Sequence, residues 1–198
     1  GGPKEVVTFD HKGFVELERL PDTVLCFSDM QAPYHHPDSL IFLKAVADKF
    51  KPDLVICPGD EADLNWLSRY EKTPELDEPM REWEQVKAFM SGIFALFPEA
   101  YCLTSNHGER FHKARALARL LEGMVVPWDE LLGAPKGWRW VDYVKAGHFV
   151  FEHGHKIGKG SRASILEEVT KRFNEHLSVV CGHHHSEMGD HIKPIWMP

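Results

Sequence analysis

Short apolar runs along this chain alternate with longer segments in which apolar residues recur at helical spacing. The short runs are rich in Val, Ile, Leu and Phe and end at polar residues, which is typical of buried strands. They predict strands over residues 24–27, 54–57, 100–104, 143–144, 148–151 and 177–181, with a turn at Ala146-Gly147. Residues 4–20 alternate weakly between apolar and polar positions and predict a short strand pair.

The longer segments predict helices over residues 38–50, 80–97, 109–121 and 162–173. Asp38 is the expected capping residue of the first, and Gly123 is the predicted stop of the third. The second carries one continuous apolar stripe, formed by Trp83, Val86, Met90, Ile93 and Phe97. A stripe of this period is typical of a helix that packs on a core.

The alternation of strands and helices indicates a layered α/β fold, in which active sites gather at the carboxyl ends of strands. A length of 198 residues fits a single domain, residues 1–198, with residues 1–20 as a short N-terminal strand extension. Residues 127–140 follow neither period and are predicted to be irregular. The three tryptophans of this segment are expected to pack, and the alternative for one of them is the floor of a pocket.

The charge, the hydropathy and the cysteine content of the chain limit which partners and which cellular location are expected. The formal net charge of −7 argues against dominant nonspecific binding to long nucleic acid, with a local basic groove as the alternative. There is no run of about 18 apolar residues and no charged-then-apolar start, so neither a membrane partner nor a signal peptide is expected. The four cysteines lack C-x-x-C spacing, which favours small buried side chains, reduced thiols and a cytoplasmic location.

Five polar clusters follow apolar runs, and each offers metal-ligand chemistry. They are SDMQ at 28–31, GDEAD at 59–63, SNHGE at 105–109, EHGH at 152–155 and GHHH at 182–185. Asp29 and Gln31 are two residues apart, so on an extended chain both side chains face the same way. Carboxylate, amide oxygen and imidazole suit divalent manganese, iron and zinc. An Asx turn at Asp29, or solvated loop histidines at His153 and His155, would explain single clusters, but five together indicate a metal-dependent active site.

In their order along the chain, these clusters resemble the motifs of the calcineurin-like metallophosphoesterase superfamily. That family shows D-x-H, GD-x-x-D, GNH followed by an acidic residue, a lone H and GHxH. The matching positions span residues 28–185 and are Asp29, Gln31, Asp60, Asp63, Asn106, His107, His153, His183 and His185. The resemblance implies a four-layer sandwich of two mixed β-sheets flanked by α-helices. It also implies a binuclear phosphoesterase that works by attack of a hydroxide shared between two metal ions.

The resemblance further implies how two divalent ions are held. The ligands of the first ion would be Asp29, Gln31, Asp60 and His185, and those of the second would be Asp60, Asn106, His153 and His183. His107 would be the general acid and not a ligand. Gln31 replaces the usual histidine, which favours manganese or magnesium, with zinc, iron, nickel and cobalt as alternatives. Gly108 replaces the usual acidic residue, so Glu109 and Asp63 are the candidates for orienting His107.

The expected substrate is a phosphodiester of a small nucleotide or of a short nucleic-acid end. The alternatives are a phosphomonoesterase, a nuclease on longer DNA or RNA, and a non-catalytic interaction platform. The candidate substrate-binding residues are His35, Arg110, His155, Lys156, Lys159 and Arg162. The last four belong to a glycine-rich basic loop that suits a second phosphate, with a flexible surface loop as the alternative. A homodimer through Ile195 and Trp196 is a further hypothesis.

Overall fold

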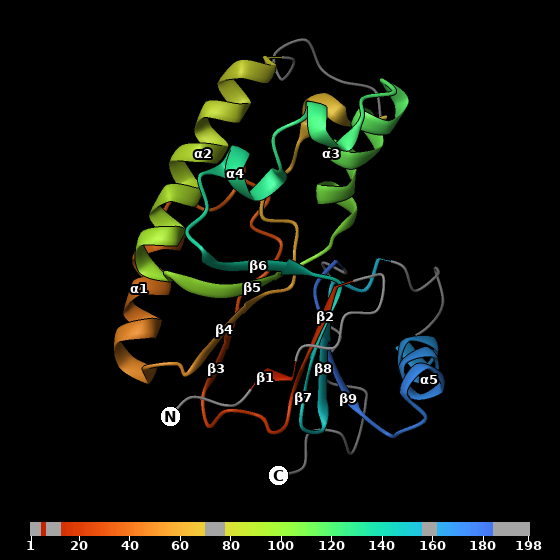
Figure 1. Ribbon diagram of the computed structural model, residues 1–198. Coiled ribbons are helices and arrows are strands. Elements are labelled where there is room, and N and C mark those ends of the chain that lie inside the picture. Colours follow the sequence, from red (N-terminus) through yellow and green to blue (C-terminus); the bar gives the residue numbers. More distant parts are fainter. Residues whose placement is uncertain (1–4, 7–12, 70–77, 156–161, 184–198) are drawn as a thin grey trace.

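Two β-sheets pack face to face at the centre of the molecule, with helices on their outer sides (Figure 1). The computed structural model describes the chain except residues 1–4, 7–12, 70–77, 156–161 and 184–198. One sheet has the strand order β1 (Glu5–Val6), β2 (Phe14–Leu17), β7 (Tyr143–Ala146), β8 (Phe149–Glu152) and β9 (Ser178–Cys181). The other has the order β3 (Val24–Cys26), β4 (Leu54–Cys57), β5 (Glu99–Leu103) and β6 (Gly137–Val141).

The described helices lie between and beyond these strands. They are α1 (Ser39–Phe50), α2 (Pro79–Leu96), α3 (Asn106–Leu117), α4 (Trp128–Leu132) and α5 (Arg162–Phe173), with 3₁₀ helices η1 (Asn65–Leu67) and η3 (Glu122–Met124). None of the described helices is both long and apolar enough to cross a membrane.

Strand direction differs between the two sheets. In the five-stranded sheet β2 pairs parallel with β7 and β8 parallel with β9, while β1–β2 and β7–β8 are antiparallel. In the four-stranded sheet every described pair is parallel, because helices cross over between successive strands: α1 after β3, α2 after β4, and α3 and α4 after β5. The α/β class is confirmed. The expectation that both sheets are mixed does not hold for the described strands of the four-stranded sheet.

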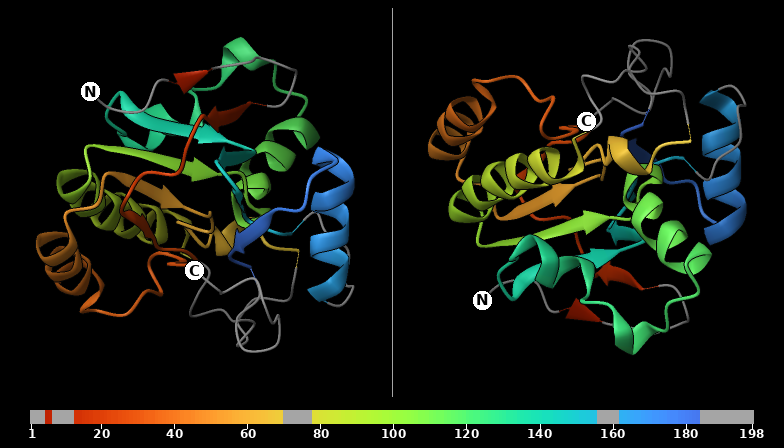
Figure 2. Two further views of the ribbon diagram at one scale, coloured as in Figure 1. Left: turned by 90° about the horizontal axis from the view of Figure 1, so that it is seen from below. Right: turned by 90° about the horizontal axis from the view of Figure 1, so that it is seen from above.

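Three apolar clusters fix the order of the layers. The cluster between the sheets includes Val15, Leu17, Ile56, Leu103, Val141 and Val144. A second cluster joins the four-stranded sheet to α1, α2 and α4, and it contains most of the predicted apolar stripe of α2. A third joins β8 to α5 through Val150, Val169 and Leu177. The order is therefore helices, sheet, sheet and helix, as both views of Figure 2 show.

Most predicted elements are present, and the main errors fall after β5. Helix α3 begins at Asn106 instead of residue 109 and ends at Leu117, so Gly123 is not its stop. Residues 127–140 are not irregular, because they form α4 and most of β6, which is held parallel to β5. Asp38 occupies the N-cap position of α1 but makes no side-chain capping hydrogen bond.

The four cysteines are free thiols, as predicted. Cys57 and Cys102 are fully buried in the core. Burial raises the pKa of the Cys26 thiol to about 12 and that of Cys181 to about 11, and it raises that of Cys102 well above its ordinary value. These thiols therefore behave as small apolar side chains.

Candidate metal centre

The loops that follow β3 and β4 lie side by side and are joined by backbone hydrogen bonds. The N–H of Asp29 donates to the carbonyl of Gly59 at 3.1 Å, and that of Gln31 donates to the carbonyl of Asp60 at 2.8 Å. Asp29 (φ 55°) and Gln31 (φ 45°) both have left-handed backbone conformations. The argument that their side chains share a direction on an extended chain is therefore wrong. The role of the Gln31 amide as a ligand stays a prediction.

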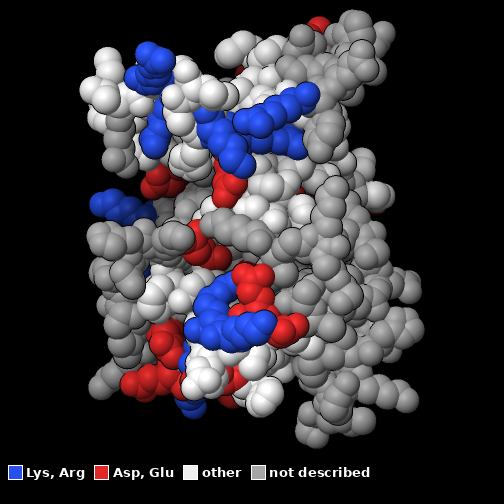
Figure 3. Space-filling model, turned by 90° about the vertical axis from the view of Figure 1, so that its right-hand side faces the viewer, with Lys and Arg blue, Asp and Glu red and all other residues white. Residues whose placement is uncertain are grey.

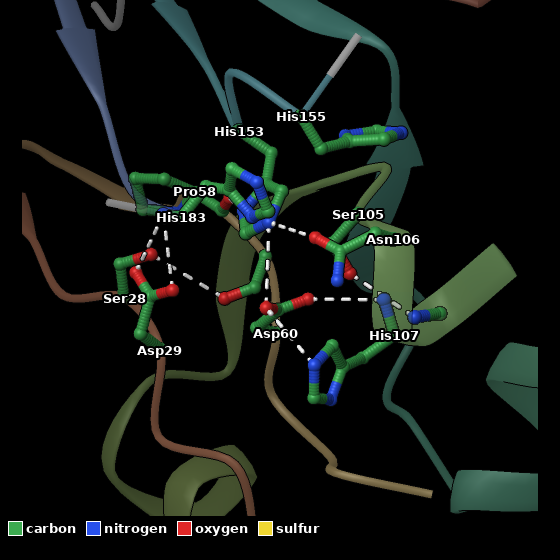
Figure 4. Close-up of polar contacts among 12 residues, drawn as sticks. Ser28, Asp29, Pro58, Asp60, Ser105, Asn106, His107, His153, His155 and His183 are labelled. Carbon is green, nitrogen blue, oxygen red and sulfur yellow. Dashed lines mark hydrogen bonds and ion pairs between the residues drawn. The ribbon is translucent and has the colours of Figure 1, made fainter. Parts of the chain in front are cut away.

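Asp60 lies in the middle of the clustered polar side chains and is 1% exposed (Figure 4). It follows Gly59, whose φ is 99°. A Cβ at Gly59 would lie 2.7 Å from the carbonyl oxygen of Leu103 and 3.1 Å from Nδ1 of His153. Glycine is therefore required here by conformation and by space, and it lets the β4 loop approach both the end of β5 and His153.

The Asp60 carboxylate is held by groups from two other loops. Its Oδ1 accepts the backbone N–H of His107 at 3.2 Å, and its Oδ2 lies 3.4 Å from Nε2 of His153. Burial alone would raise the pKa of this carboxyl. Hydrogen bonds and charge from His153, with smaller contributions from His107 and Ser105, outweigh burial and lower the pKa to about 2. Asp60 is therefore a buried carboxylate and an anionic candidate ligand at the centre of the cluster.

His153 follows β8, is 1% exposed and has a fixed orientation. Its Nδ1 lies 2.7 Å from the carbonyl oxygen of Pro58, which can only accept, so Nδ1 carries a proton. Its Nε2 then faces Oδ1 of Asn106 at 2.8 Å and Oδ2 of Asp60 at 3.4 Å. Three acceptor atoms converging in this way require a proton or a cation between them. Burial lowers the pKa of His153, but Asp60 and the Pro58 carbonyl raise it above its ordinary value.

His183 follows β9 and completes the cluster. The backbone N–H of His183 donates to both carboxylate oxygens of Asp29, at 3.0 Å and 3.2 Å. A Cβ at Gly182 would collide with the side chains of Ser28 and Asp29, so glycine is needed for this contact. One potential ligand atom from each of Asp60, His153 and His183 lies within 4.8 Å of the others.

Carboxylate, imidazole and amide oxygen around one point fit a divalent transition metal. The described members of the predicted second ligand set, Asp60, Asn106, His153 and His183, are thus all brought together. Of the predicted first set, the structure places Asp29 beside His183, while His185 lies outside the described residues.

His107 stands on the other side of Asp60, at the start of α3. Its Nδ1 lies 2.9 Å from the carbonyl oxygen of Asp63 and 3.0 Å from the carboxylate of the same residue. Its Nε2 lies 3.8 Å from Oδ2 of Asp60. Asp63 therefore orients the ring of His107. Glu109, the other candidate, contacts His155 at 3.2 Å and Lys113 at 2.7 Å instead.

Arg110 lies on the same turn of α3 and joins this network. One guanidinium nitrogen donates to the carbonyl of Asp63 at 2.6 Å, and another lies 3.1 Å from Nε2 of His107. Because a guanidinium can only donate, Nε2 of His107 is an acceptor in this arrangement. The structure therefore places Arg110 next to the imidazole, and its contact with a phosphate stays a prediction.

The other predicted substrate-binding residues have mixed outcomes. The ring of His155 lies 5.3 Å from that of His153, at the edge of the cluster. The ring of His35 instead stacks on the core residue Phe89 at 3.6 Å, which ties it to α2. The part of the chain that the structure describes does not include the candidates Lys156 and Lys159 or the side chain of Arg162. It also does not include Ile195 and Trp196, the residues of the predicted homodimer contact.

Three residues of the centre were not singled out from the sequence for their roles. Ser105 caps α3 by accepting the N–H of Gly108 at 3.1 Å, and it also hydrogen-bonds Asp60. A serine before a helical segment is a capping signal that would have placed the start of α3 correctly. Pro58 acts through its carbonyl, and Gly59 through its missing side chain, so neither has a chemical signature in the sequence.

No family model matches this chain, and neither the curated proteins nor the solved structures contain a match.

Proposed function

We propose that this protein is a metal-dependent phosphoesterase, similar to the calcineurin-like metallophosphoesterases that its motifs resemble. The observation that supports this most is the convergence of Nε2 of His153, Oδ1 of Asn106 and the Asp60 carboxylate on one point. A proton on Nε2 or a cation would satisfy these buried acceptors, and imidazole, amide oxygen and carboxylate around one point are the ligands that a divalent metal takes. A second, oriented imidazole beside the same carboxylate adds a proton-transfer group.

Each residue has a role in this proposal. A bound divalent ion supplies a Lewis acid for phosphoryl oxygens and lowers the pKa of water. Asp60, Asn106, His153 and His183 hold it, and Asp29 belongs to an adjacent site with Gln31 and His185. Nε2 of His107, an acceptor while Arg110 donates to it, would take up a proton from solvent once Arg110 turns its guanidinium to the phosphate. Nε2 would then pass this proton to the oxygen of the leaving group, while Asp63 keeps the ring in place at Nδ1.

The proposed substrates are phosphodiesters of small nucleotides or of short nucleic-acid ends, and the proposed metal is manganese. The rival proposal of a nuclease on longer DNA or RNA requires a continuous basic groove. Figure 3 shows Lys and Arg side chains gathered over the α3 region, but Lys113 there is paired with Glu109 at 2.7 Å. This pairing and the formal net charge of −7 favour the smaller substrates.

Hydrolysis of bis(p-nitrophenyl) phosphate and of p-nitrophenyl phosphate by chelator-treated protein, with and without added manganese, tests the proposal. We expect manganese-dependent turnover of the diester. Asp60→Asn should abolish turnover and lower the bound metal, His107→Ala should abolish turnover alone, and Asp48→Asn, at an exposed ion pair with Lys44, is the matched control. Turnover that does not change with Asp60→Asn would contradict the assignment, and turnover of only the monoester would make the protein a phosphatase.

A further inference from the structure

A cavity of about 280 Å³ lies beside the candidate metal centre, on the far side of the segments that carry Asp60 and His107. Its walls come from α3, α4, the start of the β4 loop and the ends of β5 and β6. The lining residues used below are Glu61, Gly108, Arg115, Val125, Trp128 and Trp140. None of them belongs to the proposed metal site.

The inner wall of the cavity is a buried carboxylate framed by two indoles. Glu61 is 3% exposed, and its Oε1 accepts the indole N–H of Trp128 at 2.9 Å and that of Trp140 at 3.1 Å. Both indole donors are neutral groups, and a carboxylate has about four acceptor positions. Both indole N–H groups are used inward. The ring of Trp128 also contacts those of Trp83 and Phe111, and the ring of Trp140 contacts that of Trp138, so each indole offers an occupant the part of its ring that lines the cavity. The alternative expectation for residues 127–140 was that one of the three tryptophans lines a pocket, and the structure shows that Trp128 and Trp140 both do.

One face of α3 supplies a positive charge to the same cavity. Gly108, His112 and Arg115 are spaced by four and three residues, so they lie on one face of the helix. Arg115 is half-buried in that wall. Asn106 and Arg110 point to the metal centre from the opposite side of the helix. Helix α3 therefore serves two separate sites with two faces.

The size of the cavity limits what it holds. Typical ligand pockets have volumes of about 300–1,000 Å³, so this one takes a ring system and not a large molecule. Aromatic walls favour a flat ring, the carboxylate at the inner wall favours one that carries an N–H donor, and the guanidinium favours an anionic substituent that points outward.

We propose that this cavity is a second binding site for a purine nucleotide. The base lies against Trp128 and Trp140 with an N–H directed to Glu61, and the phosphate lies against Arg115. Glu61 directly follows Asp60 and Gly108 directly follows His107, so an occupant contacts the backbone of both segments of the centre. Binding at this cavity needs no metal ion.

Quenching of tryptophan fluorescence and calorimetric titration with guanosine, adenosine and their 5′-monophosphates test the proposal on the full chain, with EDTA and with manganese. We expect the monophosphates to bind with a Kd below about 1 mM in both conditions, and ribose 5-phosphate not to bind. Val125→Phe fills the cavity and should weaken binding at least about tenfold. The neighbouring Val126→Phe, at a position that is 49% exposed and outside the cavity, is the matched control.

Arg115→Gln should weaken the monophosphates and leave the nucleosides unchanged. Absence of binding by the unaltered protein, binding that Val125→Phe and Val126→Phe weaken equally, or binding that EDTA abolishes would each overturn the proposal. The last result would place the nucleotide at the metal centre instead. Because the titration does not measure turnover, its outcome is separate from that of the phosphoesterase proposal.

Discussion

Replacement of Asp63 by Asn isolates the contribution of one carboxylate to the proposed acid, His107. The carboxylate lies 3.0 Å from Nδ1 of His107, and the backbone carbonyl of the same residue lies 2.9 Å from the same nitrogen. The substitution keeps the shape and the backbone contacts and removes the negative charge, which lies 3.0 Å from Nδ1 of His107 and 3.8 Å from the guanidinium of Arg110. The ring should therefore keep its tautomer and lose one hydrogen bond to a charged group.

The magnitude follows from the two kinds of hydrogen bond. A bond to a charged group contributes about 1.5–3 kcal/mol and a neutral one about 0.5–1.5 kcal/mol, so the change removes roughly 1–1.5 kcal/mol. Since about 1.4 kcal/mol is a factor of ten in rate, kcat for the phosphodiester should fall roughly tenfold, with bound manganese unchanged. The assay is hydrolysis of bis(p-nitrophenyl) phosphate at saturating manganese.

A double-mutant cycle distinguishes this role from a general structural one. If Asp63 acts through the imidazole, Asp63→Asn should have no further effect in a His107→Ala background. An equal loss of rate in both backgrounds would refute the reasoning. A loss of bound metal in the single variant would also do so, because it would assign Asp63 to the metal site.

Three further outcomes are expected. Gly59→Ala should lower the free energy of unfolding by more than about 3 kcal/mol, because the new Cβ would meet backbone atoms at a residue of positive φ; the assay is a lower Tm. The control is Gly123→Ala, which has open space around it and should change the free energy of unfolding by less than about 1 kcal/mol. Gln31→His should tighten manganese binding in a titration, and an unchanged titration would remove Gln31 from the ligand set. Cys26 and Cys102 should react with a disulfide reagent only after unfolding, because their raised pKa values keep the thiols protonated; rapid reaction of the folded protein would contradict this.

The sequence predicted the fold where local pattern and tertiary packing agree. The apolar stripe of α2 and the compact runs of β4 and β9 appear in the structure at or near their predicted limits. The prediction for residues 127–140 was wrong because β6 is a strand through its parallel pairing with β5, and pairing with a distant strand gives no hydrophobic period in the local sequence. The predicted start of α3 at residue 109 was too late, because Ser105 caps the helix and the helix begins at Asn106.

The candidate centre was predicted well by residue type and less well by geometry. Asp60 and Asn106 follow the parallel strands β4 and β5 of one sheet, and His153 and His183 follow the parallel strands β8 and β9 of the other. Strand order predicts each pair, but the packing of the two sheets, which brings the pairs together, is not recorded in the local sequence. The substrate-binding role of His35 rests on proximity in sequence and stays a prediction, while its ring stacks on Phe89 of α2. A stacking partner on a distant helix leaves no trace in the local sequence.

Anomalous diffraction from crystals soaked in manganese tests the central claim most directly, because it locates the ion without reference to activity. The account predicts a peak within coordination distance of the side chains of Asp60, Asn106, His153 and His183. It also predicts that this peak disappears in Asp60→Asn crystals. A map with no peak among these side chains at saturating manganese, or a peak that survives the substitution unchanged, would contradict it.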